Sequence, residues 1–332
     1  MARVKILLFA NTDWYLYNFR RSLALALKAA GYGVLLMSPP GPYGQRLQAL
    51  GLEWQPAPMD RRSLNPWREL RLLAWLIRLV QREDVALVHG FTIKCAVYGA
   101  LAARLAGNRP RVSAVAGLGY VFTNRSLKAR LLKPIVRSVL RVALGGRRSR
   151  LILQNPDDAA MFQEARLIGS EQVRLIPGSG VDTNRFLPAG TPPVSDRFRI
   201  LLPARLLWDK GIGELVETAR LLRQKNISVS VWLAGEPDAG NPATVSVDEL
   251  EAWQQSGLVE WLGKVEDMPA LFQSVHAVVL PSYYGEGLPK SLIEAAACAL
   301  PLITTDAPGC REVVTHDVDG LLVPPRDAKA LA

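Results

Sequence analysis

The chain has 332 residues, of which 49% are hydrophobic and 21% charged, with a net charge of +10, so it is long enough for two globular domains. This composition excludes a disordered, a collagen-like or a disulfide-stapled protein. Because the three cysteines form no zinc-like cluster and the first apolar run is too short for a signal peptide, we expect a cytoplasmic protein without a structural metal.

Short apolar strands alternate with helical stretches through the first half of the chain. Gly31 closes the first predicted helix, and Gly107 closes a later one. This alternation is typical of a doubly wound parallel sheet. The pattern predicts strands at 4–10, 33–38, 84–90, 111–117 and 149–155, and helices at 18–31 and 95–107.

Basic residues are concentrated in the first half. Residues 1–190 carry 28 Lys and Arg against 11 Asp and Glu, whereas residues 191–332 carry 12 against 19. Residues 101–150 hold 12 basic side chains and no acidic one. A predicted amphipathic helix, single or divided at Pro134, presents the four basic residues Arg130, Lys133, Arg137 and Arg141 beside an apolar stripe.

This basic helix has two interpretations. It packs on the core with a solvated basic face, or it binds an anionic membrane surface, and the lack of acidic neighbours favours the membrane. Nucleic acid is the competing polyanion, but the sequence has no zinc finger, basic zipper or RNP-type strand. We therefore expect peripheral association with the inner face of the plasma membrane and no nucleic-acid partner.

A proline-rich segment separates the two halves. We expect an N-terminal domain at 1–187, a linker at 188–196 and a C-terminal domain at 197–332. In the second half the pattern predicts strands at 198–204, 229–235, 277–282 and 301–305, and helices at 211–224, 247–257 and 289–300. The predicted fold class is α/β, with two Rossmann-like domains facing each other across a ligand-binding cleft.

Two common nucleotide-binding loops are missing from this α/β pattern. No segment satisfies GxGxxG after a first strand, and none matches the Walker A loop GxxxxGK[ST]. A dehydrogenase and a P-loop nucleotidase are therefore disfavoured.

The stretch after the predicted strand 277–282 carries the clearest chemistry. Pro289 is well placed at the first position of a helix, so the backbone N–H groups near Gly287 and Leu288 are available to an anion. Glu294 is the one carboxylate on an otherwise apolar helix. It either meets a partner in the core or lines the cleft with Glu286, where both carboxylates could accept hydroxyl hydrogen bonds.

Positive charge for a phosphate lies after the strand that opens the second half. Arg205 ends that strand and Lys210 precedes the next helix, so both are aimed at the same cleft. A guanidinium fork and an ammonium group together can neutralise a diphosphate without a metal.

Several segments resemble glycosyltransferase family 4, retaining nucleotide-sugar enzymes of the GT-B fold. The similar segments are RLLWDKG, EGLPKSLIE, PGSGVDTNRF, PGCREVV and DGLLVP. In the first half, VHGFTIKCAVYGALAARLAG, VAGLGYVF and LQNPDD are similar to bacterial members that extend undecaprenyl-diphosphate-linked sugars in surface-glycan assembly. Because such enzymes continue beyond the position of Ala332, the resemblance implies a longer C-terminal domain.

The resemblance implies a role for each residue of the second half. Arg205 and Lys210 would hold the diphosphate of a UDP-sugar and stabilise it as the leaving group. Glu294 would bind the ribose hydroxyls, and Glu286 the transferred sugar, with help from the N–H groups of Gly287 and Leu288. The implied acceptor is a lipid-diphosphate-linked saccharide, and no metal or other cofactor is required.

The acceptor side is less well defined because the chain departs from the family there. Asn11 stands where many members have a glycine-rich loop, and Gly117 and Gly119 stand where many have a histidine. His89 ends a predicted strand and has either a structural or an acceptor-site role. A nucleotide-sugar epimerase of the same fold and an inactive sugar-nucleotide-binding membrane scaffold are the alternative functions.

Overall fold

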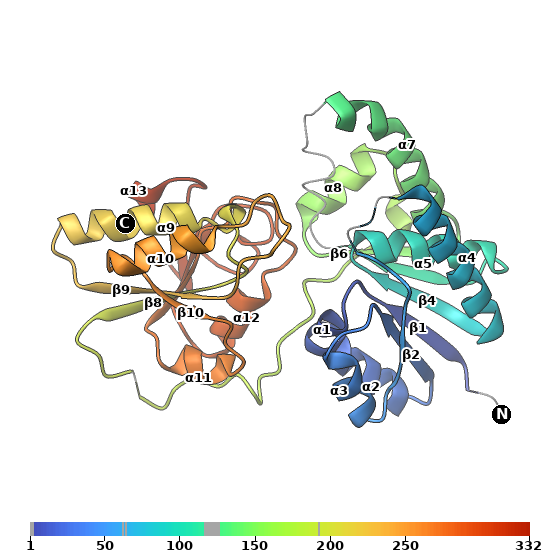
Figure 1. Cartoon of the computed structure of the whole chain (residues 1–332), viewed down its shortest axis with the longest axis horizontal. Helices are drawn as coiled ribbons and strands as arrows, with labels where there is room; N and C mark the ends of the chain where they lie inside the picture. Colours follow the sequence, from blue (N-terminus) through green and yellow to red (C-terminus); the bar gives the residue numbers. More distant parts are fainter. Residues whose placement is uncertain (1–2, 62, 64, 116–126, 192) are drawn as a thin grey trace. The chain divides into compact units, whose positions relative to one another are not determined.

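The computed structural model describes residues 3–61, 63, 65–115, 127–191 and 193–332. The chain divides into two compact units, Met1–Ser179 (unit 1) and Gly180–Ala332 (unit 2), each built on one parallel sheet (Figure 1). The division falls before the proline-rich segment because residues 180–187 pack with unit 2. Phe186 is buried in the core of unit 2, with its ring centroid 6.1 Å from that of Phe272.

Unit 1 contains a seven-stranded sheet in the order β3-β2-β1-β4-β5-β6-β7, and its neighbouring strands are parallel. The strands are β1 (Lys5–Phe9), β2 (Gly33–Ser38), β3 (Glu53–Pro56), β4 (Val85–Phe91), β5 (Arg111–Ala114), β6 (Ser149–Leu153) and β7 (Val173–Leu175). The helices are α1 (Asp13–Tyr15), the π-helix η1 (Leu16–Arg20), α2 (Arg21–Ala29), α3 (Tyr43–Ala49), α4 (Pro66–Arg82), α5 (Ile93–Leu105), α7 (Leu127–Leu144), α8 (Pro156–Glu164) and the 3₁₀ turn η2 (Ser170–Gln172).

Both faces of the unit 1 sheet are covered, which explains why β1 is apolar at every position after Lys5. Leu7 and Phe9 belong to the cluster that packs under α4 and α5. Ile6 and Leu8 point to the opposite face and join the cluster that includes α2 and α3 residues. Strands buried on two faces read as continuous apolar runs, as the sequence of β1 does.

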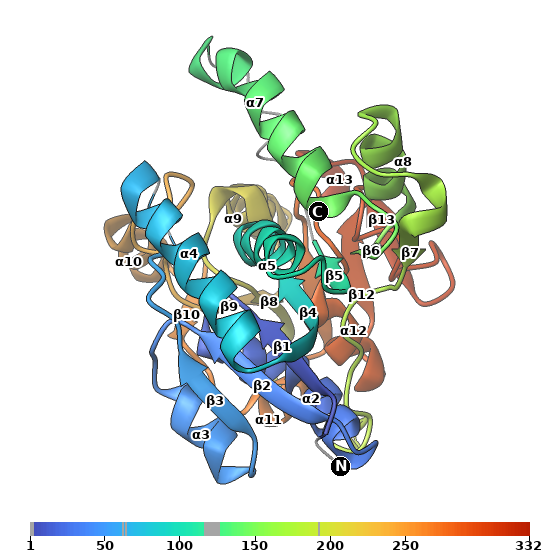
Figure 2. The ribbon, with the colours of Figure 1, turned by 90° about the vertical axis from the view of Figure 1, so that its right-hand side faces the viewer.

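Helix α7 is one continuous helix from Leu127 to Leu144, so Pro134 does not divide it in two. It stands out from the rest of unit 1 in Figure 2. Side chains of this helix are described from Val136 onward. No helix in the described ranges combines the length and apolarity that crossing a membrane requires.

Unit 2 contains a six-stranded parallel sheet in the order β10-β9-β8-β11-β12-β13. The strands are β8 (Phe198–Pro203), β9 (Val229–Ala234), β10 (Glu260–Gly263), β11 (Ala277–Leu280), β12 (Leu302–Thr305) and β13 (Gly320–Val323). The helices are the 3₁₀ turn η3 (Trp208–Lys210), α9 (Ile212–Gln224), α10 (Val247–Gln255), α11 (Met268–Gln273), α12 (Lys290–Ala297) and α13 (Ala328–Leu331). Helices α9 and α10 cover one face, and α11 and α12 the other (Figure 1).

The strand order of each sheet reverses direction at one place. In unit 1 the reversal lies between β1 and β4, and in unit 2 it lies between β8 and β11. At such a switch point the loops after two neighbouring strands diverge and leave a crevice at the carboxyl ends, where α/β sheets bind ligands. We therefore expect ligand sites at the loops after β1, β4, β8 and β11.

Candidate functional site

The switch point of unit 2 brings a lysine and a glutamate together. Lys210 ends η3 in the loop after β8, and Glu286 lies in the loop after β11. The Lys210 ammonium donates a hydrogen bond to Glu286 Oε1, and the two side chains are only 15% and 14% exposed. Ser282 Oγ donates to the same carboxylate oxygen at 2.8 Å. The pair is thus held in a place where water screens its charges only partly.

The backbone holds these two loops in close contact. Gly211 follows η3 with φ 76°, and a Cβ at this position would overlap the carbonyl oxygen of Pro281. The N–H of Tyr283 donates to the carbonyl of Asp209 at 3.2 Å. Glycine is therefore required sterically at the point where the Lys210 loop meets the loop after β11.

A third loop, after β12, packs against the backbone of Glu286 and Gly287. The N–H of Glu286 donates to the carbonyl of Pro308 at 3.1 Å. Gly309 has φ 88°, and a Cβ there would overlap the carbonyl oxygen of Gly287. The Glu286–Gly287 backbone is therefore fixed by packing against residues 308–309.

Glu294 forms an ion pair with Lys290, a residue of the same helix. Pro289, predicted as the first helical residue, is instead the N-cap of α12, and the helix begins at Lys290. Lys290 Nζ lies 3.5 Å from Glu294 Oε1 at i,i+4 spacing. Burial raises the pKa of Glu294, while Lys290 and Arg185 oppose that rise. The spacing of Lys290 and Glu294 was visible in the sequence, yet this pairing was not among the predictions.

Arg205 has a different environment from Lys210. Its Nη1 lies 2.7 Å from Asp238 Oδ2, and its side chain is 62% exposed. Asp238 is only 14% exposed, so water screens this ion pair only in part, and the Arg205 guanidinium is its accessible member. Asp238 lies in the loop after β9 and was not singled out in the sequence.

Cysteine chemistry is disfavoured beside this site. Cys310 follows Gly309 and is fully buried, and burial raises the pKa of its thiol to about 11. The protonated thiol is a poor nucleophile at neutral pH. Among the described residues, no group of three or more His, Cys, Asp or Glu side chains is arranged to hold a metal ion.

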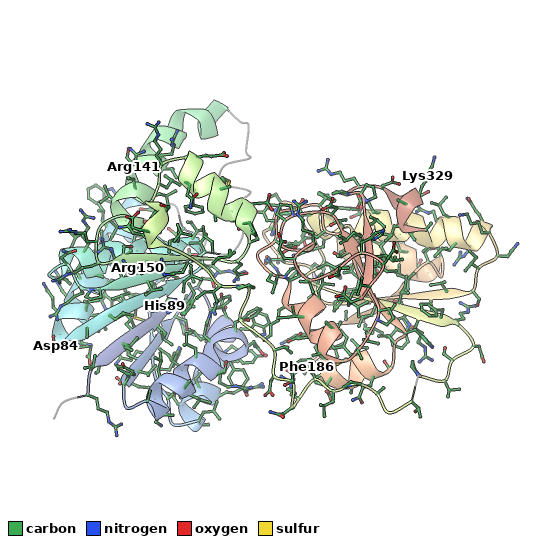
Figure 3. The ribbon with its side chains drawn as sticks, turned by 180° about the vertical axis from the view of Figure 1, so that it is seen from behind. Asp84, His89, Arg141, Arg150, Phe186 and Lys329 are labelled. Carbon is green, nitrogen blue, oxygen red and sulfur yellow. The ribbon has the colours of Figure 1, made fainter. Side chains whose placement is uncertain are left out.

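The switch point of unit 1 contains two of the acceptor-side candidates. Asn11 is half-buried directly after β1. His89 lies on β4, inside the unit as Figure 3 shows, and its buried Nε2 has no hydrogen-bond partner among the described residues. Burial and the charge of Arg20 lower the pKa of His89 to about 3. Gly117 and Gly119 lie outside the described residues.

Asp13 serves the structure in this region. Its Oδ2 accepts hydrogen bonds from the N–H groups of Tyr43 at 2.6 Å and Gly44 at 2.9 Å, at the start of α3. Its Oδ1 accepts from the N–H of Trp14 at 2.8 Å. A carboxylate at a helix N-terminus is favourable, so Asp13 joins the loop after β1 to α3.

The basic helix α7 also makes structural contacts. Arg137 donates to the carbonyl of Ala165 at 2.8 Å and Arg141 to that of Arg166 at 2.8 Å, although both side chains are exposed. The side chains of Arg130 and Lys133 lie outside the described part of the helix. Arginine side chains thus satisfy free carbonyls at the end of α8.

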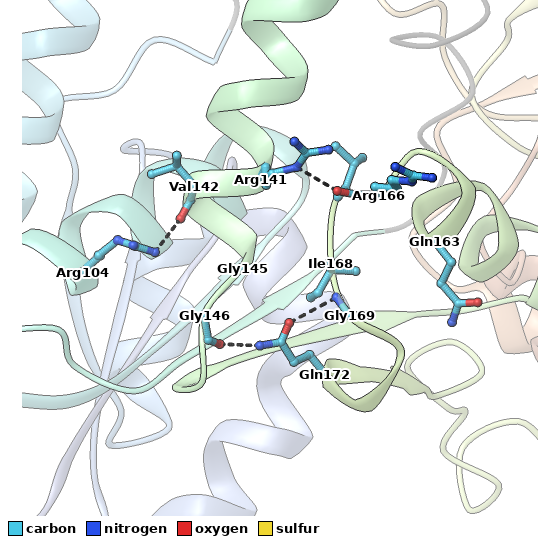
Figure 4. Close-up of a pocket in the computed structure, with 11 residues that line it drawn as sticks. Arg104, Arg141, Val142, Gly145, Gly146, Gln163, Arg166, Ile168, Gly169 and Gln172 are labelled. Carbon is cyan, nitrogen blue, oxygen red and sulfur yellow. Dashed lines mark hydrogen bonds between the residues drawn. The ribbon is translucent and has the colours of Figure 1, made fainter.

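Beside α7 lies a pocket of about 580 Å³ (Figure 4). Arg104, Arg141 and Arg166 line it, and Arg104 donates to the carbonyl of Val142 at 3.0 Å. Gln172 also lines the pocket and donates to the carbonyl of Gly146 at 2.6 Å. The pocket adds to the positive surface at this end of unit 1, away from the loops after β1 and β4.

The two parallel α/β sheets match the GT-B fold of glycosyltransferase structures. The structure of Anabaena Alr3699/HepE in complex with UDP-glucose has the same fold, with a TM-score of 0.76 and 21% identity over 98% of this chain and 87% of that chain. Residues 197–332 match the family model described as glycosyl transferases group 1, and residues 5–155 match the one described as glycosyl transferase 4-like. The chain belongs to this family, glycosyltransferase family 4.

Two bacterial relatives are similar along most of the chain. The N,N'-diacetylbacillosaminyl-diphospho-undecaprenol alpha-1,3-N-acetylgalactosaminyltransferase of Campylobacter jejuni is 29% identical, with 96% of this chain and 84% of that protein covered. The UDP-Gal:alpha-D-GlcNAc-diphosphoundecaprenol alpha-1,3-galactosyltransferase of Escherichia coli is 25% identical, with 79% of this chain and 68% of that protein covered. Family membership confirms the prediction of a family 4 glycosyltransferase.

Proposed function

We propose that this enzyme transfers a hexose or N-acetylhexosamine from a UDP-sugar to a saccharide carried on a lipid diphosphate, in the assembly of a cell-surface glycan. The names of the Campylobacter and Escherichia relatives, which act on diphospho-undecaprenol-linked acceptors, support the acceptor class. UDP-glucose in the Anabaena structure supports the donor class.

The observation that carries the proposal is the contact between Lys210 and Glu286 at the switch point of unit 2. An ammonium group has three N–H donors, so Lys210 can hold Glu286 and still donate to phosphate oxygens. In this proposal Lys210 and Arg205 bind the diphosphate of the donor. Glu286 and the N–H groups of Gly287 and Leu288 bind the transferred sugar, and Glu294 accepts from the ribose hydroxyls.

The reaction places charge where these groups can stabilise it. The bond between the anomeric carbon and the UDP oxygen breaks, and UDP leaves with the electron pair. The acceptor hydroxyl oxygen bonds to the anomeric carbon on the same face, so the configuration is retained, and its proton passes to the departing phosphate. Fixed positive charge beside the leaving group lowers the barrier because it needs no reorganisation as the negative charge develops.

Lys210→Ala tests the donor site. We expect UDP to bind about 10- to 100-fold more weakly, because a charge-assisted hydrogen bond contributes about 1.5–3 kcal/mol. Calorimetric titration with UDP measures this affinity, and the yield of lipid-linked product measures transfer. Lys329→Ala, an exposed lysine on α13, is the matched control.

The substitution also removes the Lys210 ammonium from Glu286, so the double variant Lys210→Ala/Glu286→Gln separates charge imbalance from phosphate binding. Both variants should lose UDP affinity if Lys210 binds the diphosphate. An unchanged dissociation constant in both would refute this role.

We further propose that unit 1 places the enzyme on the inner face of the cytoplasmic membrane through α7. The exposed side chains of Arg137 and Arg141 and the absence of acidic residues between positions 101 and 150 support this placement. An anionic lipid surface attracts each nearby Lys or Arg by about 1 kcal/mol.

A further inference from the structure

A buried arginine in unit 1 lacks a counter-ion. Arg20 ends the π-helix η1 and is only 9% exposed. Its Nη2 donates to the Tyr15 hydroxyl at 2.9 Å, whereas its Nε is buried without an acceptor in the described part of the chain. No carboxylate among the described residues forms an ion pair with it. An uncompensated buried charge is costly, so such a guanidinium calls for an anion.

The positions outside the described ranges supply no carboxylate either. Residues 116–126 read AGLGYVFTNRS, and the other five are Met1, Ala2, Arg62, Leu64 and Pro192. None is Asp or Glu.

A second unsatisfied nitrogen lies close to Arg20. The Arg20 guanidinium lies 4.4 Å from the centroid of the Phe91 ring, and the His89 ring centroid lies 4.1 Å from the same ring. His89 Nε2 is buried without a partner among the residues that the structure describes. The charge of Arg20 reaches His89, since it helps to lower the pKa of the imidazole. One nitrogen of Arg20 and one of His89, each buried without a hydrogen-bond partner in the described part of the chain, thus lie near the same Phe91 ring.

Their place in the fold is that of a ligand site. Phe91 is the last residue of β4, and η1 follows β1 and the short helix α1, so the cluster lies at the switch point of unit 1. A π-helical turn is rare and is frequently found at functional sites. A guanidinium fork matches the oxygens of a phosphate.

We propose that Arg20, with Tyr15 and His89, forms an oxyanion site in unit 1 that binds the diphosphate group of the lipid-linked acceptor. The identity of this ligand rests on the proposed function, whereas the oxyanion site itself does not. In the proposed function, Lys210 and Arg205 of unit 2 bind the donor diphosphate, and the surplus of basic residues in the first half of the chain favours a second polyanionic ligand there.

The test uses the full chain with UDP at saturation, so that the donor site is filled. Inorganic pyrophosphate, farnesyl diphosphate and farnesol are titrated by calorimetry, and the Nε–H signal of Arg20 is followed by ¹⁵N NMR. We expect both diphosphates to bind and to shift this signal, and farnesol to do neither.

Three variants sharpen the result. Arg20→Gln should weaken diphosphate binding by about 10- to 100-fold, as expected for the loss of a charge-assisted hydrogen bond. Arg20→Lys keeps the positive charge, so its affinity for the diphosphates should lie between those of wild type and Arg20→Gln. Arg21→Gln, at the neighbouring half-buried arginine, should leave binding unchanged. In transfer assays Arg20→Gln should raise the KM for the acceptor without changing the affinity for UDP.

The outcomes separate this inference from the proposed function. Unchanged diphosphate affinity in Arg20→Lys and Arg20→Gln, with no shift of the Arg20 signal in wild type, would overturn the oxyanion site even if transfer is intact. Binding of pyrophosphate but not farnesyl diphosphate would overturn the assignment to the acceptor. If wild type neither binds UDP nor transfers sugar, the proposed function fails, while Arg20-dependent pyrophosphate binding would still support the site. If Arg20→Gln does not fold, Arg20→Lys and the wild-type NMR titration decide.

Discussion

At the residue scale, the two cations of the candidate site in unit 2, Lys210 and Arg205, differ in how exposed their side chains are. Lys210 and Glu286 are about equally enclosed, and Ser282 adds a hydrogen bond to the carboxylate. Arg205 is mostly exposed, whereas its partner Asp238, at 2.7 Å, is as enclosed as Glu286. Water therefore screens the carboxylate of each ion pair only in part, and the two pairs differ in the exposure of the cation. Lys210 is the enclosed cation and Arg205 the accessible one.

His89 makes stability depend on pH. The pKa of its imidazole is about 3 in the folded protein, against an ordinary value near 6.5, because burial and Arg20 disfavour the charged form. Below pH 6.5 the unfolded chain takes up a proton that the folded chain does not, so stability is lost as the pH falls toward 3. His89→Gln should reduce the loss in free energy of unfolding between pH 7 and pH 5 by about 2 kcal/mol.

Urea unfolding of both proteins at the two pH values measures this difference. Identical losses for wild type and His89→Gln would show that the imidazole is not held neutral.

At the scale of elements, the candidate site depends on how closely three loops approach one another. Gly211 touches the backbone of Pro281, and Gly309 touches that of Gly287. Both have positive φ values, of 76° and 88°. Close packing of main chain on main chain leaves little freedom for Lys210 and Glu286, which the same loops carry.

Gly211→Ala should destabilise unit 2 by about 2–4 kcal/mol, since it adds overpacking to the strain of a positive φ. Gly263→Ala is the matched control, because Gly263 has φ 65° but a Cβ added there would meet no other atom within 4 Å. Strain alone should cost that variant about 1 kcal/mol. Chemical denaturation measures both, and UDP titration of Gly211→Ala should show weaker binding. Equal destabilisation of the two variants would contradict the close approach at Gly211.

At the scale of the whole molecule, charge is divided between the two halves of the chain. Residues 1–190 have an excess of basic side chains and residues 191–332 an excess of acidic ones. Net charge acts on association with other charged surfaces rather than on the fold. This division fits a unit 1 that meets anionic lipid and a unit 2 that does not.

Reversal of Arg130, Lys133, Arg137 and Arg141 to Glu should reduce binding to anionic vesicles by more than about 100-fold, given about 1 kcal/mol for each basic residue at the surface. Sedimentation with anionic vesicles at increasing salt concentration measures the binding of both proteins. Four exposed basic residues of unit 2, reversed together, are the control, namely Arg220, Arg223, Lys225 and Lys264. Since Arg137 and Arg141 also hold carbonyls at the end of α8, a circular dichroism spectrum confirms that the variant is folded. Equal binding by the two reversed proteins would exclude α7 as the membrane surface.

Much of the fold was predictable because it is encoded locally. The apolar runs that form β1, β4, β8 and β11 were recognisable without a structure, as were their alternation with helices and the fold class. Lys210, Glu286 and Glu294 were singled out from their places after predicted strands and on a predicted helix, and the family resemblance added their proposed roles. Arg20 was missed, because within an apparently regular helix it looked like a solvated arginine.

The sequence alone determined the α/β alternation and the family, because strand and helix patterns depend on neighbouring residues and the family segments are continuous. The short strands β3, β7 and β10 and the helix α4 were not among its predictions. Only the tertiary structure decided which charges meet. Arg205 and Asp238 are 33 positions apart, and Lys210 and Glu286 are 76 apart. Such pairs are set by the order of strands in the sheet and the close approach of its loops. The burial of Arg20 beside His89 was decided in the same way, because β4 lies next to β1 only in the folded sheet.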